Sequence, residues 1–193
     1  MIEKIKKEAL AAKVPIIEDE ALAFICDLIQ KNKLWRILEL GSAVAYSTIA
    51  MAMVSEKISI EGIERDDLRY AKAIENISIT GMDSRIKIYH NDIDKQEFSG
   101  FYDLIFIDAA KASYQKYLDR FIHQLNRGGM MIFDNINFHN LKIEEVKSRR
   151  IKALLRKIDN FKKYLDTLNT ITYEKYEIGD GLIVIRRRED GII

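Results

Sequence analysis

Two acidic residues, Asp108 and Asp134, stand at the ends of short apolar segments, and Asn135 directly follows the second. Each aspartate comes after at least four consecutive apolar residues, where an isolated carboxylate is costly unless it is paired or bound to a metal. Two carboxylates and an amide oxygen that leave coordination positions open suit Mg²⁺. The alternative is that these residues cap helices at strand-to-helix junctions, which requires all three to be caps.

A second group of residues is typical of a site for a nucleotide-like cofactor. Gly41 lies where an apolar segment runs into a predicted helix, so the backbone can approach a ligand there and the helix N-terminus favours anionic groups. Glu64 ends the next apolar segment, 23 residues after Gly41, where an acid can accept hydrogen bonds from ribose hydroxyls. Asp92 follows a third segment and either faces an adenine or caps a turn.

The type of cofactor is indicated by what surrounds Gly41. The GxGxxG pattern of dinucleotide binders is absent, because Gly41 is the only glycine in this loop. Glu39 lies two residues earlier, where a carboxylate suits a cationic group such as a sulfonium better than a pyrophosphate. The loop therefore favours S-adenosylmethionine over NAD, with an ordinary turn and a surface glutamate as the alternative.

Apolar periodicity alternates between strand-like and helix-like patterns along the chain. This alternation is typical of an α/β fold with a doubly wound, mostly parallel sheet, and the glycine-containing turn at 179–181 predicts an antiparallel C-terminal hairpin strand. In such a sheet, ligands bind beyond the carboxyl ends of the strands. The expected strands are Trp35–Leu40, Lys57–Glu64, Arg85–His90, Tyr102–Asp108, Met130–Asp134, Thr170–Ile178 and Leu182–Arg187. The expected helices are Ile2–Ala12, a second opened by Glu18 and Asp19, Tyr46–Ser55, Asp66–Thr80, Ser113–Leu125 and Ile151–Leu168.

The whole chain, 1–193, is predicted to form one domain, because it contains no linker, repeat or low-complexity tract. N-terminal helices occupy 1–31 and a cofactor and metal core occupies 36–135. A basic helical segment at 142–168 and a terminal hairpin at 170–187 complete the domain.

Composition limits the class of protein further. Of the 193 residues, 48% are hydrophobic and 32% are charged, as in a globular protein. No run of 18 apolar residues occurs, so we expect no membrane span, and the N-terminus lacks the features of a secretory signal. Cys26 is the single cysteine, which excludes a disulfide framework and a cysteine-ligated zinc site. We therefore expect a cytoplasmic protein.

The net charge of +1 conceals one basic segment. The window Lys142–Lys163 holds nine basic residues and three acidic ones. Such a segment either faces a polyanion or is the solvated face of a helix. The candidate RNA-binding residues in it are Arg149, Arg150, Lys152, Arg156 and Lys157.

These residues together resemble a known family, the divalent-cation-dependent O-methyltransferases of catechol and caffeoyl-coenzyme A. The matching stretches are ILELGSAVAYS, IEGIERDDLRYAKAIENI, YDLIFIDAAKASY, GGMMIFDN and IGDGLIVIRR. The resemblance implies a Rossmann-like fold, S-adenosylmethionine as the methyl donor, Mg²⁺ or another divalent cation, and a homodimer. It implies that Asp108, Asp134 and Asn135 hold the metal and that Lys111 is the catalytic base. It also places the cofactor against Ile17, Glu39, Gly41, Ser47, Glu64, Asp92, Ile93 and Asp108.

Within this family the chain most resembles the bacterial tRNA 5-hydroxyuridine methyltransferases, which make 5-methoxyuridine at the wobble position. The likeness rests on the short chain, its ending, and the basic helix RRIKALLRKIDNFKKYL before the last two strands. It implies the anticodon stem-loop of tRNA as partner, with the basic segment on its phosphates. One departure from the family is Ala45, which stands where the family has a glycine. The methyl group of this alanine would crowd the cofactor. Four aromatic residues either stack on a flipped base or make contacts in the core or in a dimer: Tyr114, Tyr117, Phe138 and His139.

The expected reaction is transfer of a methyl group from a sulfonium to a hydroxyl oxygen. Chelation of two neighbouring acceptor oxygens by the metal would lower the pKa of the hydroxyl, and Lys111 would take its proton. Three alternatives stand beside the tRNA acceptor: a small catechol-like acceptor, a non-catalytic RNA-binding protein on a methyltransferase fold, and a dehydrogenase, which the missing glycines disfavour.

Overall fold

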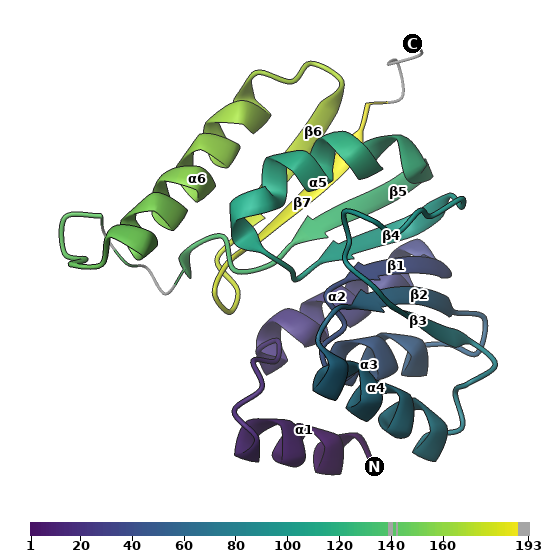
Figure 1. Cartoon of the computed structure of the whole chain (residues 1–193). Helices are drawn as coiled ribbons and strands as arrows, with labels where there is room; N and C mark the ends of the chain where they lie inside the picture. Colours follow the sequence, from purple (N-terminus) through teal and green to yellow (C-terminus); the bar gives the residue numbers. More distant parts are fainter. Residues whose placement is uncertain (139–140, 142, 189–193) are drawn as a thin grey trace.

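The computed structural model describes residues 1–138, 141 and 143–188, and a seven-stranded sheet runs through this part of the chain (Figure 1). The strand order is β3-β2-β1-β4-β5-β7-β6. The strands are β1 (Arg36–Leu40), β2 (Ser59–Glu64), β3 (Ile86–His90), β4 (Tyr102–Ile107), β5 (Leu125–Phe133), β6 (Ile171–Tyr176) and β7 (Leu182–Arg187). The α-helices are α1 (Ile2–Ala11), α2 (Asp19–Asn32), α3 (Tyr46–Met53), α4 (Asp67–Ile79), α5 (Tyr114–Phe121) and α6 (Arg149–Asp166).

The sheet is parallel except for its C-terminal hairpin. β1 pairs in parallel with β2 and β4, while β2–β3 and β4–β5 are also parallel pairs. β7 pairs antiparallel with both β5 and β6. The strand order reverses between β1 and β4, which makes the carboxyl ends of these two strands the expected ligand position in a doubly wound sheet. The predicted α/β class with an antiparallel hairpin strand is confirmed.

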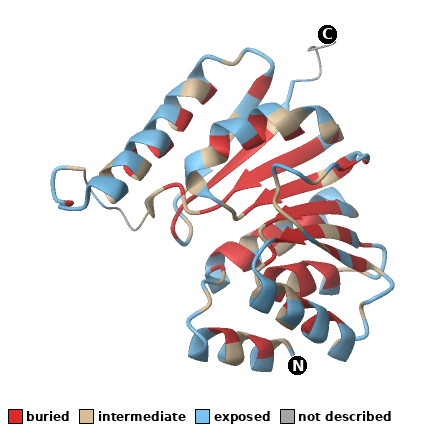
Figure 2. Ribbon diagram, in the orientation of Figure 1, coloured by how far each residue is buried: buried red, intermediate tan, exposed pale blue. Residues whose placement is uncertain are grey.

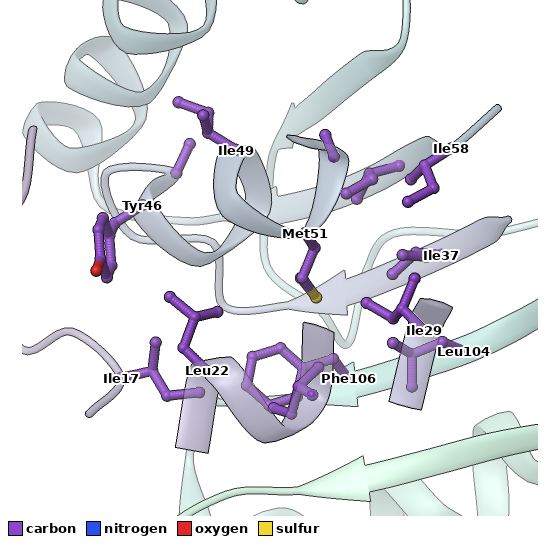
Figure 3. Packing of buried hydrophobic residues seen from close by; sticks show 14 of the residues in the cluster. Ile17, Leu22, Ile29, Ile37, Tyr46, Ile49, Met51, Ile58, Leu104 and Phe106 are labelled. Carbon is purple, nitrogen blue, oxygen red and sulfur yellow. The ribbon is translucent and has the colours of Figure 1, made fainter. Parts of the chain in front are cut away.

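Successive residues of each central strand enter opposite hydrophobic layers, because side chains alternate across a sheet. Ile37 belongs to the layer between the sheet and α1–α4, whereas Leu38 belongs to the layer beneath α5 and α6. The central strands are buried on both faces, as Figure 2 shows in red. Figure 3 shows Phe106 packed among residues of the first layer. Burial on both faces explains why these strands read as short apolar runs.

β5 begins at Leu125, five residues earlier than the predicted start at Met130, and therefore includes Gly128 and Gly129. A Cβ at Gly129 would lie 3.0 Å from the carbonyl oxygen of Asp103, so this glycine lets β5 pass closely by β4. The predicted helix Ser113–Leu125 is instead α5 between two short 3₁₀ turns, η1 (Lys111–Ser113) and η2 (Ile122–Gln124).

The basic segment is only partly helical in the described residues. α6 begins at Arg149, after Ser148, whose side chain accepts a hydrogen bond from the Ile151 N–H. Residues 143–145 form a turn and 146–148 have no regular secondary structure, and Lys142 lies outside the described residues. In the described ranges, no helix combines the length and apolar character needed to cross a membrane. The single domain and the cytoplasmic location stay predictions.

Candidate active site

A pocket of about 460 Å³ opens at the carboxyl ends of the central strands, next to the point where the strand order reverses. One wall comes from the segment before α2, and the others come from the loops that follow β1, β2, β3, β4 and β5 and from the β6–β7 turn. Its walls include Pro15, Ile16, Glu18, Gly41, Ala43, Glu64, Arg65, Asn91, Asp92, Ile93, Asp108, Lys111, Tyr117, Asp134, Asn135, Phe138 and Asp180.

Gly41 is required by the contact between two strand ends. Its φ is +99°, and a Cβ built there would lie 2.3 Å from the carbonyl oxygen of Asp108. The sequence interpretation gave this glycine the task of admitting a ligand. Gly41 does line the pocket, but the backbone of Asp108 is what excludes a side chain.

The loop after Gly41 has a left-handed backbone and is held by a side chain of α4. Ala43 and Ala45 both adopt left-handed backbone conformations, with φ of +45° and +63°. Asn76 of α4 donates from Nδ2 to the carbonyl oxygen of Val44 at 2.8 Å. Ala45 is fully buried and is absent from the described pocket walls, and the crowding of the cofactor by its methyl group stays a prediction. The family's glycine is explained by the left-handed backbone, which glycine adopts at least cost.

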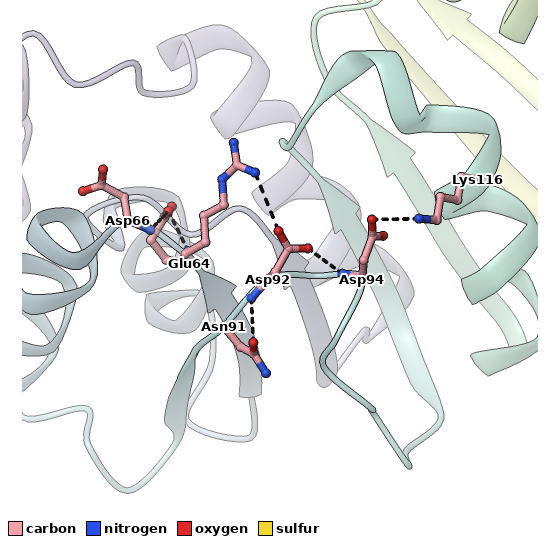
Figure 4. Close-up of polar contacts among 7 residues, drawn as sticks. Glu64, Asp66, Asn91, Asp92, Asp94 and Lys116 are labelled. Carbon is pink, nitrogen blue, oxygen red and sulfur yellow. Dashed lines mark hydrogen bonds and ion pairs between the residues drawn. The ribbon is translucent and has the colours of Figure 1, made fainter.

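Glu64 forms a fixed acidic wall at the end of β2 (Figure 4). Its Oε2 accepts a hydrogen bond from the Ala43 N–H at 3.0 Å, and its Oε1 accepts from the N–H groups of Arg65 and Asp66 at 2.8 Å each. These three donors orient a carboxylate that is 8% exposed. Because a carboxylate has about four acceptor positions, such an oriented group keeps capacity for a ligand hydroxyl.

Asp92 caps a turn, as one of the two sequence interpretations expected, and it also lines the pocket, while its contact with an adenine stays a prediction. Its Oδ1 accepts from the Asp94 N–H at 2.8 Å, and its Oδ2 lies 3.7 Å from Nη1 of Arg65. Figure 4 shows this group together with the 2.7 Å ion pair between Asp94 and Lys116. Ile93 also lines the pocket, and its carbonyl oxygen accepts a hydrogen bond from Arg120 at 2.5 Å.

Glu39, Ser47 and Ile17 are buried and are not part of the described pocket walls. Glu39 accepts a hydrogen bond from Ser47 Oγ at 2.6 Å and another from the Thr48 hydroxyl. Burial raises the pKa of Glu39 to about 7, and the hydroxyl hydrogen bonds oppose that rise. Glu39 and Ser47 thus contact each other, and Ile17 is next in sequence to Ile16 and Glu18, which line the pocket. The contact of these three residues with a cofactor stays a prediction.

Asp108, Asp134, Asn135 and Lys111 meet at one end of the pocket. β4 and β5 pair with Ile107 opposite Phe133, so Asp108 and Asp134 leave neighbouring strands side by side. Asp134 is 1% exposed, and Lys111 Nζ donates a hydrogen bond to Asn135 Oδ1. The structure thus brings together all four residues predicted for the metal and the base.

The electrostatics of this end favour a cation. Burial and the charge of Asp108 raise the pKa of Asp134 to about 7, against the opposing effects of the Asn135 N–H and Lys111. Burial also raises the pKa of Asp108, and Lys111 lowers it. In the described residues no three His, Cys, Asp or Glu side chains gather as a metal site. The donor set is two carboxylates and one amide oxygen, which fits a hard divalent cation.

The aromatic residues divide into core and pocket. Tyr114 is 1% exposed, donates its hydroxyl to the Asp134 carbonyl oxygen, and packs against Phe133 and Phe161. It therefore belongs to the core, which was the expected alternative to stacking on a base. Tyr117 and Phe138 line the pocket, and His139 lies outside the described residues.

Asp180 is a pocket residue that the sequence analysis missed. It was treated only as part of the hairpin turn, yet it is 6% exposed and lines the same pocket as Asp134. The signal that would have revealed it is an acid between two glycines inside the matching stretch IGDGLIVIRR.

The predicted RNA-binding residues lie on α6, outside the described pocket walls. Arg149, Arg150, Arg156 and Lys157 are exposed and Lys152 is half-buried. α6 contacts η1, the turn that begins with Lys111, so the helix lies close to the acidic end of the pocket.

Comparisons with known proteins agree with this geometry. The chain is 26% identical over 189 residues to a caffeoyl-CoA O-methyltransferase of Populus kitakamiensis, covering 90% of this chain and 77% of the relative. It is 36% identical over 107 residues to a catechol O-methyltransferase of Niastella koreensis, covering 52% of this chain and 48% of the relative.

Two solved structures show the same fold. A Staphylococcus aureus protein assigned as a caffeoyl-CoA O-methyltransferase superposes with a TM-score of 0.92 at 29% identity, covering 97% of this chain and 92% of that chain. A Podospora anserina methyltransferase bound to S-adenosylhomocysteine has a TM-score of 0.80 at 22% identity, covering 88% and 78%. The O-methyltransferase family model matches residues 2–188. With the fold of S-adenosylmethionine-dependent methyltransferases and this match across nearly its whole length, the chain belongs to the O-methyltransferase family.

Proposed function

We propose that the protein transfers a methyl group from S-adenosylmethionine to a hydroxyl of a small catechol-like acceptor, with a divalent cation such as Mg²⁺ bound in the pocket. The observation that carries this proposal is the convergence of Asp108, Asp134, Asn135 and Lys111 at one end of a pocket that has Glu64 at the other. The relatives named as caffeoyl-CoA and catechol O-methyltransferases support the acceptor class.

The donor end would bind the cofactor through acidic groups with set orientations. Glu64 is held by three main-chain N–H groups and would accept hydrogen bonds from the ribose hydroxyls. Asp92 would face the adenine, because it lines the pocket from the end of β3. Because Gly41 has no side chain, the loop after β1 lies directly against the backbone of Asp108.

The acidic end would bind the cation and the acceptor. Asp108, Asp134 and Asn135 would hold the cation, which supplies a positive charge that lowers the pKa of an acceptor hydroxyl. Lys111 Nζ would accept the hydroxyl proton. Lys111 now donates to Asn135 Oδ1, which is also the predicted ligand oxygen, so the lysine must release this oxygen to reach an acceptor.

The test is methyl transfer by the purified protein from labelled S-adenosylmethionine to catechol or to tRNA that contains 5-hydroxyuridine, with Mg²⁺ or with EDTA. We expect labelled catechol that depends on Mg²⁺. Asp134→Ala should abolish the transfer, and Asp94→Ala should not, because Asp94 is exposed and outside the described pocket walls. Transfer that survives EDTA or Asp134→Ala would contradict the metal-dependent mechanism.

One observation favours tRNA 5-hydroxyuridine as a second candidate acceptor. α6 presents exposed Arg149, Arg150, Arg156 and Lys157 and contacts the turn that carries Lys111. Cations beside a base-modifying site would position the anticodon stem-loop by its phosphates. The neighbouring 5-hydroxyl and O4 of that base would offer the same pair of oxygens as a catechol.

Charge reversal separates the two acceptors. Arg156→Glu with Lys157→Glu should weaken methylation of tRNA and reduce its salt dependence, while methylation of catechol stays unchanged. If tRNA labelling is absent in the unaltered protein, or is insensitive to these substitutions, the tRNA proposal fails.

We also propose that the protein forms a homodimer, as the family resemblance implies. Sedimentation velocity over a range of concentrations measures this directly. A monomer at all concentrations would contradict it.

A further inference from the structure

The turn between β6 and β7 brings an acidic side chain into the pocket. Gly179 and Gly181 adopt left-handed conformations, with φ of +56° and +83°, and Asp180 between them is 6% exposed. Asp180 lines the pocket together with Asp134 and Asn135, although 45 residues of sequence separate Asp180 from Asn135. This acid is unused by the reaction described above.

The backbone of this turn is fastened to the chain that follows the predicted metal ligands. The Ile136 N–H donates to the Gly181 carbonyl oxygen at 3.1 Å, and the Asn137 N–H donates to the Asp180 carbonyl oxygen at 2.9 Å. A Cβ at Gly181 would lie 2.7 Å from Asn137 Cγ, so the two segments are in close contact. Main-chain groups therefore fix where Asp180 stands relative to Asp134, and its side chain is not needed for these contacts.

Asp180 brings a further negative charge to this end of the pocket, because the carbonyl oxygens of Asp180 and Gly181 are hydrogen-bonded to the two residues that follow Asn135. Its carboxylate adds negative charge to a pocket that Asp108 and Asp134 also line, and this charge is unfavourable in the absence of a cation. An asparagine could occupy the same turn without that charge. A cation at this end of the pocket would offset that charge.

We propose that Asp180 is a positioning residue of the divalent-cation site: held by the β6–β7 turn, its carboxylate supports the cation that Asp108, Asp134 and Asn135 bind. It acts through its charge from outside the ligand set. This inference rests on the proposed metal-dependent function. It adds that the C-terminal hairpin completes the acidic site that the parallel strands begin.

The test is a titration of the purified protein with Mg²⁺ by calorimetry, comparing Asp180→Asn with Glu177→Gln. Glu177 is the matched control, because it carries the same charge near the turn and accepts a hydrogen bond from Asn137, but is outside the described pocket walls. Asp180→Asn should weaken Mg²⁺ binding about tenfold or more, the usual effect of changing a residue that supports metal ligands. Glu177→Gln should change the Mg²⁺ affinity less than about twofold, because Glu177 does not support the metal ligands.

Kinetics supply a readout that a merely structural role would not change. In Asp180→Asn the Mg²⁺ concentration for half-maximal methyl transfer should rise by the same factor as the dissociation constant, while kcat at saturating Mg²⁺ stays within about threefold. Asp180→Ser, which is also neutral and smaller, should repeat the effect if Asp180→Asn does not fold.

The outcomes separate this inference from the function on which it rests. Equal Mg²⁺ affinity in the unaltered protein and in Asp180→Asn would overturn the role of Asp180 and leave the metal-dependent function standing. No Mg²⁺ binding by the unaltered protein would overturn the proposed function, and the inference with it.

Discussion

Gly41 shows how one residue can decide the geometry of the pocket. Gly41→Ala should destabilise the protein by about 3 kcal/mol or more, because the new Cβ would lie 2.3 Å from a backbone oxygen and the φ of +99° is strained for alanine. Gly81→Ala is the matched control, since its φ is +68° and a Cβ there meets no atom within 4 Å. It should cost only about 1 kcal/mol. Chemical denaturation measures both, and equal losses would contradict the steric explanation.

Asp134 makes the metal-free protein sensitive to pH. The folded protein keeps a proton on this carboxyl up to about pH 7, whereas the unfolded chain loses it near about pH 4. Between these values the folded state binds more protons, so this group lowers the stability as the pH rises. Asp134→Asn removes the penalty and should stabilise the metal-free protein by about 2 kcal/mol at pH 8, with no gain near pH 4.

Thermal melts at the two pH values, with EDTA present, measure this difference. A gain of about 2 kcal/mol corresponds to a rise in Tm of roughly 4–8 °C for a chain of this length. The same substitution should remove Mg²⁺ binding. If Asp134→Asn gains less stability over the unaltered protein at pH 8 than at pH 4, the raised pKa of Asp134 is contradicted.

The sequence was informative about polar residues that come directly after a buried strand. Asp108, Asp134 and Asn135 were identified because polar residues after buried strands share one edge of the sheet, whereas Lys111 was identified from the family resemblance. Asp180 was missed because its acid stands in a hairpin turn, where aspartate and glycine are ordinary turn residues. The burial of Glu39 with the hydroxyls of Ser47 and Thr48 was not predictable from spacing, since it depends on how the loop folds over β1.

At the scale of elements, α6 packs through Phe161 against residues next to the acidic end of the pocket. Phe161 is 1% exposed, with ring centroids 4.8 Å from Phe133 and 5.6 Å from Tyr114, which donates a hydrogen bond to the Asp134 carbonyl. Phe161→Ala should destabilise the protein by about 3–5 kcal/mol, because it leaves a cavity in this cluster. Lys157→Ala, on the exposed face of α6, should change stability by less than about 0.5 kcal/mol. Urea denaturation compares them, and a small loss in Phe161→Ala would show that α6 is only loosely packed.

Element types followed from apolar periodicity, and boundaries followed less well. The seven strands were expected, and β7 has the predicted bounds Leu182–Arg187. β5 extends through Gly128 and Gly129, which end helices in most contexts, because close approach to β4 requires a glycine at Gly129. Local glycine preferences were therefore overridden by a contact between distant segments.

At the scale of the whole molecule, the sheet order explains why residues from distant parts of the chain line one pocket. The reversal between β1 and β4 places the loop at Gly41 next to the acids after β4 and β5. The antiparallel hairpin then brings Asp180 to the same end. The doubly wound sheet was predictable from the alternation of elements, whereas the contribution of the hairpin turn required the three-dimensional structure.

The most direct test of the central claim is a crystal of the protein grown with S-adenosylhomocysteine and Mn²⁺, measured for anomalous scattering. The account predicts one strong anomalous peak in contact with oxygen atoms of Asp108, Asp134 and Asn135, with Lys111 no longer bonded to Asn135. A pocket that holds S-adenosylhomocysteine but shows no peak between these three side chains would contradict the claim that a divalent cation presents the acceptor hydroxyl for methyl transfer.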